Sequence, residues 1–568
     1  MSKKGKWTLL ITGILVPLLL VLSNRKVATR LFSESRWRVE KLPESNVQVP
    51  SKRSIQWNNH SAFADSLYQS WKEDSTGEWS FEKKMELPRT LLARLLAKKN
   101  IAEVNRQILT LKPWGTPGSK WWLNPKGGYD FSATTFATIL YLFDEKPEIL
   151  FPEAKKHLVE ILLNDEGEGY SEAVPGTLGR IIDSENHILM AQGSKYLKNR
   201  YLMLHGSQDA RYDNEKNGLE AGLLAKLKEL TTMGLYEFNS VPYLGYTLAA
   251  LLNLEAFGTE NIRNASREVL DYLSFSYALG SYQLNYYPPF RRRYERAKNS
   301  SLSKDYQTVF MKTWLSYHPD IQKISRVESG ESHALIAACM PYRPADEVID
   351  LIFGKNPGYF VKLGHGSDGS PEIYSAGPGY LLSAGGVNRG KWSNIVARPV
   401  CLFLEEGAGE ITELVHLKGK GKDFMQWNNT GVYRDFACTN GTLFVPGKYQ
   451  PAATNAIWKV YLVNDTLSFA THSAEGFAII ALFRNRKPRD LADQLIKNNP
   501  DPKKLQKKFH SPVGSFLEYD VNSPNDQWVI TGVDGQPTDR DFGQWPLING
   551  EYPIRKSVVS TINTIESN

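Results

Sequence analysis

The stretch RIIDSENHILMAQGSKYLKNRYL, residues 180–202, joins a polar cluster to the beginning of an amphipathic helix. Asp183 or Ser184 is a suitable N-cap residue, because its side-chain oxygen can accept hydrogen bonds from the unpaired N–H groups of the first turn. Glu185 and Asn186 would then lie in that turn, beside the positive end of the helix dipole. The stretch therefore predicts a helix that begins with a cluster of polar side chains.

His187 completes this cluster. The positive field at a helix N-terminus disfavours a charged imidazole, so His187 is a candidate proton acceptor. The other interpretation is structural, since acidic and amide residues are common at helix starts and a histidine there often only packs. The rest of the chain has to distinguish a catalytic cluster from an ordinary helix start.

The composition limits the class of protein. With 568 residues the chain is too long for a single core, and about two or three domains are expected. Hydrophobic residues make up 41% and charged residues 23%, which is typical of globular proteins. The net charge of +7 is mild and no nucleic-acid-binding module is recognisable, so nucleic acid is not expected as a partner. The 3 cysteines are widely spaced, which argues against a zinc site or a disulfide framework.

The N-terminus carries the apolar run WTLLITGILVPLLLVLS, residues 7–23, with basic residues on both sides. This is the pattern of a signal peptide, and the run is at the short end for a membrane-spanning helix. We therefore expect residues 1–24 to be a signal peptide or an N-terminal membrane anchor, and the protein to be exported to the periplasm, the cell surface or the medium. Membrane contact is expected only through this segment. Residues 25–55 are polar, contain proline and are expected to form a linker.

The middle of the chain has helical periodicity. From residue 56 to about 320, apolar residues recur at spacings of three and four, as in FSATTFATILYLF at 131–143 and YLGYTLAALLNLEAF at 243–257. Loops rich in glycine and proline separate these segments. A series of helices without intervening strands fits antiparallel helical hairpins better than a doubly wound sheet.

After about residue 320 the pattern changes to short segments rich in β-branched and aromatic residues. The run AIWKVYLVNDTLSFATHS at 456–473 is an example, and Gly, Asn, Asp and Pro separate such segments. This pattern predicts an antiparallel β-sandwich. The sequence therefore predicts a multidomain α+β protein with its helices before its strands.

An export signal followed by helical hairpins and a β-sandwich resembles the chondroitin AC lyase and heparinase-type polysaccharide lyases. The resemblance covers nearly the whole chain after the N-terminal segment, as architecture and a few residue types. It implies a catalytic (α/α) toroid at 56–320 that forms one wall of a sugar-binding cleft, and a β-sandwich domain at 321–568 that closes the cleft. The implied partner is a polysaccharide or oligosaccharide, anionic in character.

The resemblance also implies β-elimination at a uronic acid. In these families an asparagine or an acidic residue neutralises the carboxylate, a histidine or tyrosine removes the C5 proton, and a tyrosine protonates the leaving oxygen. Asn186 and His187 match these residue types, although they are adjacent here and separate in the chondroitin AC type. The chemistry requires donors already placed where charge develops on the carboxylate, and a base that can reach the proton.

Two later stretches supply further candidates. In YEFNSVPYLGY, residues 236–246, Tyr243 lies nearest the loop, and Glu237 could orient the imidazole or bind a hydroxyl. In YQLNYYPPFRRRYER, residues 282–296, arginines among aromatic residues suit carboxylate or sulfate recognition, although a solvated basic turn is the alternative. The residues assigned to catalysis are Asn186, His187, Tyr243 and Arg292. The residues assigned to substrate binding are Glu185, Glu237, Trp121, Trp122, Arg291, Arg293, Tyr294 and His365.

Two other functions stay open. A glycoside hydrolase on the same toroid would use paired carboxylates about 5–9.5 Å apart, for which Asp183, Glu185 and Glu237 are available. A non-catalytic envelope protein could instead bind glycans through its aromatic and arginine side chains. The sequence has no P-loop, GxSxG or HExxH motif, which argues against P-loop NTPases, the common serine hydrolases and the common zinc peptidases. No cofactor and no metal site are predicted, and Ca²⁺ stays open because scattered loop oxygens leave no spacing signature.

Overall fold

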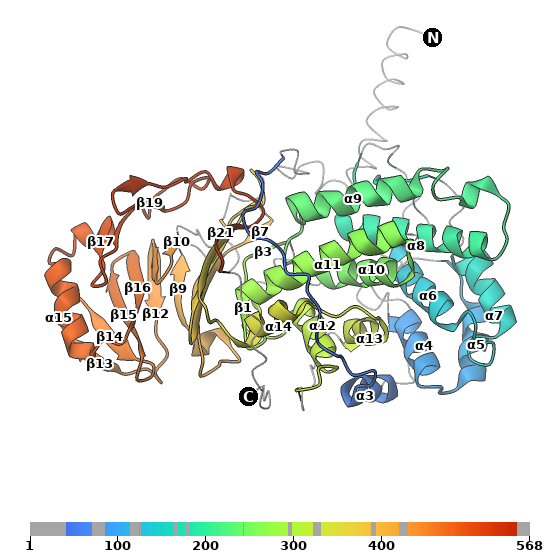
Figure 1. The fold of residues 1–568 in the computed structure, drawn as a ribbon, viewed down its shortest axis with the longest axis horizontal. Helices are drawn as coiled ribbons and strands as arrows, with labels where there is room; N and C mark the ends of the chain where they lie inside the picture. Colours follow the sequence, from blue (N-terminus) through green and yellow to red (C-terminus); the bar gives the residue numbers. More distant parts are fainter. Residues whose placement is uncertain are drawn as a thin grey trace, which may run out of the picture.

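A computed structural model shows a mixed arrangement of helices and antiparallel sheets, as expected for a multidomain α+β chain (Figure 1). The structure describes residues 41–70, 86–113, 124, 127–163, 169–175, 177, 181–241, 243–292, 298–321, 331–367, 369–387, 394–419 and 430–553. The expected signal peptide or anchor at 1–24 lies outside these residues. Within them, no helix is both long enough and apolar enough to cross a membrane.

The helical half begins at α3 (Ala62–Ser70) and ends at α14 (Asp346–Phe353), so helices continue beyond residue 320, where we expected strands to begin. The longer elements between them are α4 (Glu86–Leu96), α5 (Ile101–Thr110), α6 (Asp130–Phe143), α7 (Pro152–His157), α8 (Glu185–Leu204), α9 (Leu219–Met233), α10 (Tyr243–Phe257), α11 (Glu260–Gly280), α12 (Tyr306–Leu315) and α13 (Glu331–Cys339). Short elements in this half are the π-helix η2 (Leu158–Leu162), the 3₁₀ helix η3 (Ala210–Tyr212) and the strands β1 (Ser281–Tyr282), β2 (Asn285–Tyr286) and β3 (Phe290–Arg291).

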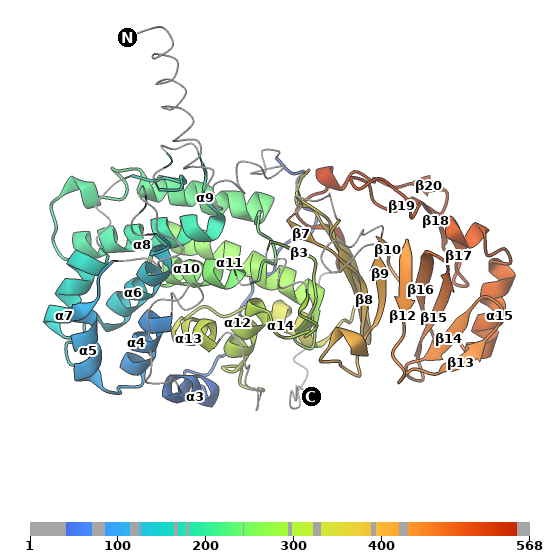
Figure 2. The same ribbon diagram turned by 180° about the vertical axis from the view of Figure 1, so that it is seen from behind.

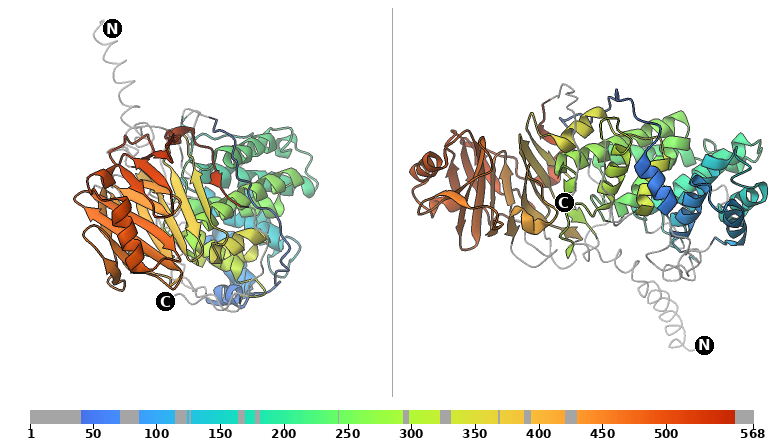
Figure 3. Two further views of the ribbon diagram at one scale, coloured as in Figure 1. Left: turned by 60° about the vertical axis from the view of Figure 1, so that its left-hand side comes forward. Right: turned by 90° about the horizontal axis from the view of Figure 1, so that it is seen from below.

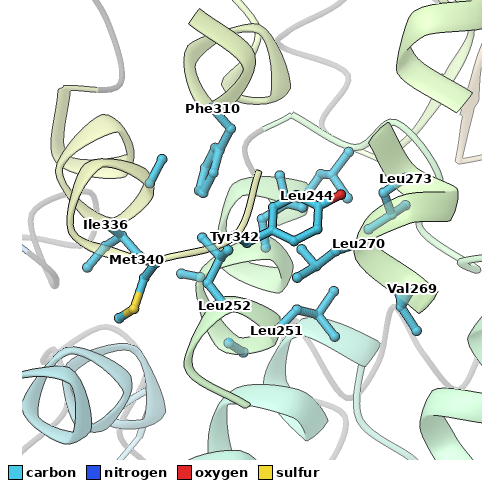
Figure 4. Packing of buried hydrophobic residues seen from close by; sticks show 14 of the residues in the cluster. Leu244, Leu251, Leu252, Val269, Leu270, Leu273, Phe310, Ile336, Met340 and Tyr342 are labelled. Atoms are coloured by element: carbon cyan, nitrogen blue, oxygen red, sulfur yellow. The ribbon is translucent and has the colours of Figure 1, made fainter. Parts of the chain in front are cut away.

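Helix α10 is the centre of the helical half. Its sequence is apolar on nearly every side, and a helix of that kind is stable only when it is buried. It packs against α6, α8, α11, α12 and α13. Figure 4 shows Leu251 and Leu252 of α10 in one cluster with Leu270 of α11 and with Tyr342, which follows α13. The neighbouring helices are therefore arranged around α10.

The second half contains a seven-stranded antiparallel sheet in the order β12-β9-β8-β6-β5-β4-β21. Its strands are β4 (Tyr359–Leu363), β5 (Glu372–Gly377), β6 (Tyr380–Gly385), β8 (Arg398–Leu404), β9 (Val415–Gly419), β12 (Gly441–Phe444) and β21 (Asn549–Glu551). Because successive side chains of a strand point to opposite faces, the sheet divides its residues between two cores. Leu381 and Phe403 belong to the core of the helical half, whereas Leu382 and Leu402 belong to a second core.

A six-stranded antiparallel sheet supplies the other side of the second core, in the order β10-β11-β16-β15-β14-β13. Its strands are β10 (Thr430–Tyr433), β11 (Phe436–Thr439), β13 (Pro451–Thr454), β14 (Lys459–Leu462), β15 (Leu467–Ala474) and β16 (Phe477–Arg484). Helix α15 (Pro488–Asn498) packs on β13 and β14. Figures 2 and 3 show the resulting order of helices, seven-stranded sheet and six-stranded sheet from other sides.

Smaller elements complete the second half. A four-stranded sheet is formed by β17 (Lys508–His510), β18 (Phe516–Tyr519), β19 (Ile530–Val533) and β20 (Gln536–Pro537), and β7 (Ile395–Val396) pairs with β3 of the helical half. Further 3₁₀ helices in the described part of this half are η5 (Ile411–Glu413), η7 (Lys504–Gln506) and η8 (Phe542–Gln544). All three cysteines are free. The pairing of β3 with β7 fixes the chain directly before Arg292 to the second half.

An extended segment, residues 41–60, joins both halves along one side of the molecule (Figure 1). The Asn46 side chain exchanges two hydrogen bonds with the backbone of Gly550, at 2.9 and 3.1 Å. The Ser54 N–H donates to the Asp346 carboxylate at 2.7 Å, where α14 begins. The described part of the expected linker, residues 41–55, is thus bonded to the sheet edge and to the helices.

The two buried faces of the seven-stranded sheet can be tested with adjacent leucines. We expect Leu381→Ala and Leu382→Ala each to lower the free energy of unfolding by about 2–5 kcal/mol, because both side chains are fully buried on opposite faces. Leu462→Ala, in β14 and 46% exposed, is the matched control and should change stability by about 0.5 kcal/mol or less. Urea denaturation measures all three, and a Leu381 or Leu382 variant as stable as the control would contradict two-sided burial.

Candidate active site

The predicted helix start is present. Ser184 is the N-cap of α8, with extended backbone angles of φ −76° and ψ 155°, and Glu185 is the first helical residue. The Ser184 hydroxyl does not cap the helix but donates to the Asn186 side-chain oxygen Oδ1 at 2.6 Å. This bond orients the Asn186 amide. Its Nδ2 group is buried and has no hydrogen-bond partner in the described part of the chain, so it is a donor still available for binding.

His187 is paired with Asp130, a residue that sequence reasoning missed. The two side chains are only 12% and 11% exposed, and Nδ1 of His187 lies 2.7 Å from Oδ2 of Asp130. Since a carboxylate accepts, Nδ1 carries the proton, and Nε2 keeps the lone pair that can take one up. Asp130 begins α6, which packs against α8, so two helix N-termini meet at this pair. The local signal for Asp130 in the sequence is its position at the end of the glycine-containing run KGGYD, residues 126–130, directly before a helical segment.

The Glu185 side chain is buried. Its Oε1 accepts the backbone N–H of Tyr236, while Oε2 has no hydrogen-bond partner among the described residues. Burial, and secondly the negative charge of Glu237, raise the pKa of Glu185 to about 7. Direct substrate contact, which we expected of Glu185, does not fit this burial. It holds the loop before α10 in place.

Glu237 is paired with Arg292 and not with the imidazole, as the sequence had led us to consider. The Arg292 guanidinium also lies over the ring of Tyr243, 4.6 Å from its centroid. Arg292 is 28% exposed and adopts a left-handed backbone conformation, with φ 73°. A cation held in this way between a carboxylate and an aromatic face is fixed in position and still reaches solvent.

Arg291 has a different environment from its neighbour Arg292. It is buried, its guanidinium lies 3.7 Å from the centroid of the Tyr236 ring, and its backbone N–H donates to Phe238 at 3.1 Å. These contacts connect β3 to the loop before α10. The expected role of Arg291 in substrate binding does not fit its burial, and a positioning role does.

A row of aromatic rings connects His187 to Tyr243. The His187 ring meets Phe131 at 5.1 Å, Phe131 meets Tyr246 at 4.7 Å, and Tyr246 meets Tyr243 at 6.3 Å between centroids. His187, Tyr243 and Arg292 therefore belong to one neighbourhood, to which the starts of α8 and α10 and the chain after β3 contribute. Each of the three is partly exposed.

His365 supports this neighbourhood from the second half. It is 1% exposed, its ring stacks on Phe238 at 3.9 Å, and its Nε2–H donates to Glu372 at 2.6 Å. Glu372 also accepts from Tyr374 and, at 2.8 Å, from Asn239, whose backbone has a φ of 49°. The expected contact of His365 with substrate does not fit its burial. Glu372 and Asn239 were not found from the sequence, because neither lies in a recognisable motif.

Four of the expected binding residues, Trp121, Trp122, Arg293 and Tyr294, lie outside the described residues. Among those that the structure describes, no group of three or more His, Cys, Asp or Glu side chains could hold a metal ion. No known protein-family model matches this chain, and no curated protein matches it. The geometry of the site is therefore the main guide to the function.

The buried carboxyl of Glu185 predicts how stability changes with pH. The fold favours the neutral form of the Glu185 carboxyl. The stability that this form contributes is fully present below the unfolded pKa near 4.5, and it is lost as the pH rises from there through about 7. We expect Glu185→Gln to be more stable than the wild type at pH 8 by about 3 kcal/mol, and equally stable at pH 4.5. Urea denaturation at both pH values measures the difference.

The control is Glu413→Gln. Backbone hydrogen bonds from Gly409 and Glu410 lower the pKa of Glu413, so this variant should be less stable than the wild type at pH 8, the opposite direction. A Glu185→Gln effect that is the same at both pH values would contradict the burial of an ionisable carboxyl at this position.

Proposed function

We propose that the protein is an exported polysaccharide lyase that cleaves an acidic, uronate-containing glycan by β-elimination. The observation that carries the proposal is the His187–Asp130 pair, which the rings of Phe131 and Tyr246 connect to Tyr243 and Arg292. It supplies an oriented base, a phenolic acid and a fixed cation within one partly exposed neighbourhood. Export is proposed from the N-terminal segment of the sequence.

The reaction assigns a role to each side chain. Nε2 of His187 removes the C5 proton of the uronate, while Asp130 holds the imidazole and stabilises it once it is charged. Negative charge moves onto the carboxylate, where Arg292 and the unpaired Nδ2 of Asn186 can stabilise it. The bond from C4 to the leaving oxygen breaks, a C4–C5 double bond forms, and Tyr243 donates the proton that the leaving oxygen needs.

The fold is compatible with this role. We propose that the helical half, arranged around α10, is an incomplete (α/α) toroid, and that the seven- and six-stranded sheets with their shared core form a β-sandwich. The contacts of Phe238 with His365 and of Asn239 with Glu372 support a site built where the two halves meet. The proposed chemistry requires no cofactor.

Hydrolysis of the same glycan is the second candidate. A carboxyl whose pKa is raised to about 7, as in Glu185, is suited to general-acid catalysis, and the carboxylate of Glu237 interacts with it. Both carboxylates are buried, however, so a substrate would reach them only after the loop before α10 moved. The His187–Asp130 pair is partly exposed, which favours elimination over hydrolysis. A non-catalytic glycan-binding protein is the third candidate. A product assay distinguishes it from the two enzymes.

The assay offers alginate, pectate, chondroitin, hyaluronan and heparin to the purified protein and measures unsaturated, ultraviolet-absorbing products. We expect one of these polymers to be cleaved, and His187→Ala to lower kcat by about 10²–10⁴. The control His510→Ala changes an exposed histidine in β17 and should leave kcat unchanged. New reducing ends without ultraviolet absorbance would favour hydrolysis, and binding without either signal would favour a non-catalytic protein.

Asp130→Asn tests the orientation of the base. Because the amide can present its donor to Nδ1, the imidazole would be held in the wrong tautomer, and we expect kcat to fall by about 10²-fold or more while KM changes little. A pH profile of kcat on the glycan that is cleaved provides the measurement. Wild-type kcat in this variant would mean that Asp130 does not orient the base.

A further inference from the structure

A hollow beside the candidate active site has no role in the proposed reaction. Its lining includes Asn239, Ser240 and Leu244 of the loop and helix that also carry Glu237 and Tyr243. His187, Tyr243 and Arg292 are not among its lining residues. The Cα atoms of Ser240 and Tyr243 can be at most about 11 Å apart, because only three peptide units separate them. The hollow therefore lies within reach of a ligand bound at the active site.

Two buried polar atoms at this hollow have no hydrogen-bond partner in the described part of the chain. They are the Ser240 hydroxyl oxygen and Oε1 of Gln307. The other end of the Gln307 amide is fixed, since Nε2 donates to the Leu273 carbonyl at 2.8 Å. An unpaired buried polar atom costs about 1–3 kcal/mol, so a ligand that supplied a hydroxyl donor to Oε1 would recover part of this cost.

The aromatic and charged side chains that line the hollow indicate which other chemical groups the ligand carries. The Arg398 guanidinium lies over the rings of Tyr287 and Phe290, at 4.1 and 5.2 Å, and all three line the hollow. Lys304 adds an exposed cation. Among the described lining residues the one carboxylate is that of Asp305, which accepts from the Thr308 N–H at 2.8 Å as the N-cap of α12. The positive charges of Arg398 and Lys304 exceed the negative charge of Asp305 by one, which favours a ligand with a single negative charge.

We propose that this hollow is a second sugar subsite, which binds a further uronate ring of the same glycan, near the ring that reacts. Hydroxyl donors of the ring meet Gln307 and Ser240, the ring packs against the aromatic side chains, and its carboxylate meets Lys304 and Arg398. The role of this subsite in catalysis rests on the proposed function, whereas the binding of a uronate in the hollow does not. The loop 236–241 would then contact the glycan on both sides, at the reaction centre and at the hollow.

The test measures binding, not cleavage. Methyl β-D-glucuronide and methyl β-D-glucoside, which differ only in the carboxylate, are titrated into the full chain carrying His187→Ala and followed by NMR. We expect the glucuronide to bind more tightly than the glucoside. Adding Ser240→Ala should weaken the binding of both about 3–10-fold, because it removes one hydrogen bond, and adding Lys304→Gln should weaken only that of the glucuronide.

The matched control is Ser266→Ala, which removes another buried hydroxyl that has no hydrogen-bond partner among the described residues; it belongs to α11 and does not line the hollow. Equal glucuronide affinity in the Ser240 and Ser266 variants, or no measurable binding, would overturn the subsite. The proposed function can fail independently of the subsite. In that case no uronate polymer is cleaved, but Ser240→Ala and Lys304→Gln still weaken glucuronide binding.

Discussion

The two-sided burial of the seven-stranded sheet is the constraint on which the rest of the structure depends. One set of alternate side chains in β6 and β8 packs on the helices, and the other set packs on the six-stranded sheet. A shift of register by one residue would exchange the two sets, so both cores fix the same register. The sheet therefore acts as a rigid partition between the two halves.

This register also determines which polar residue of β5 faces the helices. Glu372 and Tyr374 are two residues apart, so they share a face, and Tyr374 lies in the helical core. Glu372 consequently points toward Asn239 and holds the loop that carries Tyr236 and Glu237. Through Tyr236 and Glu237 the same loop contacts Glu185 and Arg292. The arrangement of the candidate site thus depends on the register of a sheet that contributes none of its partly exposed catalytic groups.

Local signals in the sequence predicted the local parts of this arrangement. The N-cap at Ser184 and the helix beginning at Tyr243 were found because capping and periodicity involve residues close together in the chain. Asp130 was missed because it meets His187 across 57 positions, through the packing of α6 on α8. The burial of Arg291 and His365 was missed for the same reason. Nothing in an arginine-rich loop or a glycine-rich turn indicates which side chain will face the interior.

The extended segment at 41–60 has a consequence for the order of folding. The Asn46 side chain is hydrogen-bonded to Gly550, so this contact can form only after the chain has been synthesised through residue 550. Contacts of such long sequence separation are slow to form, and the helices emerge from the ribosome long before the last strand. Until β21 pairs with β4, β4 is an unpaired edge of the sheet and residues 41–60 lack their contact with Gly550. A chain that has not yet paired β21 with β4 therefore exposes a strand edge to misassembly and an extended segment to proteolysis.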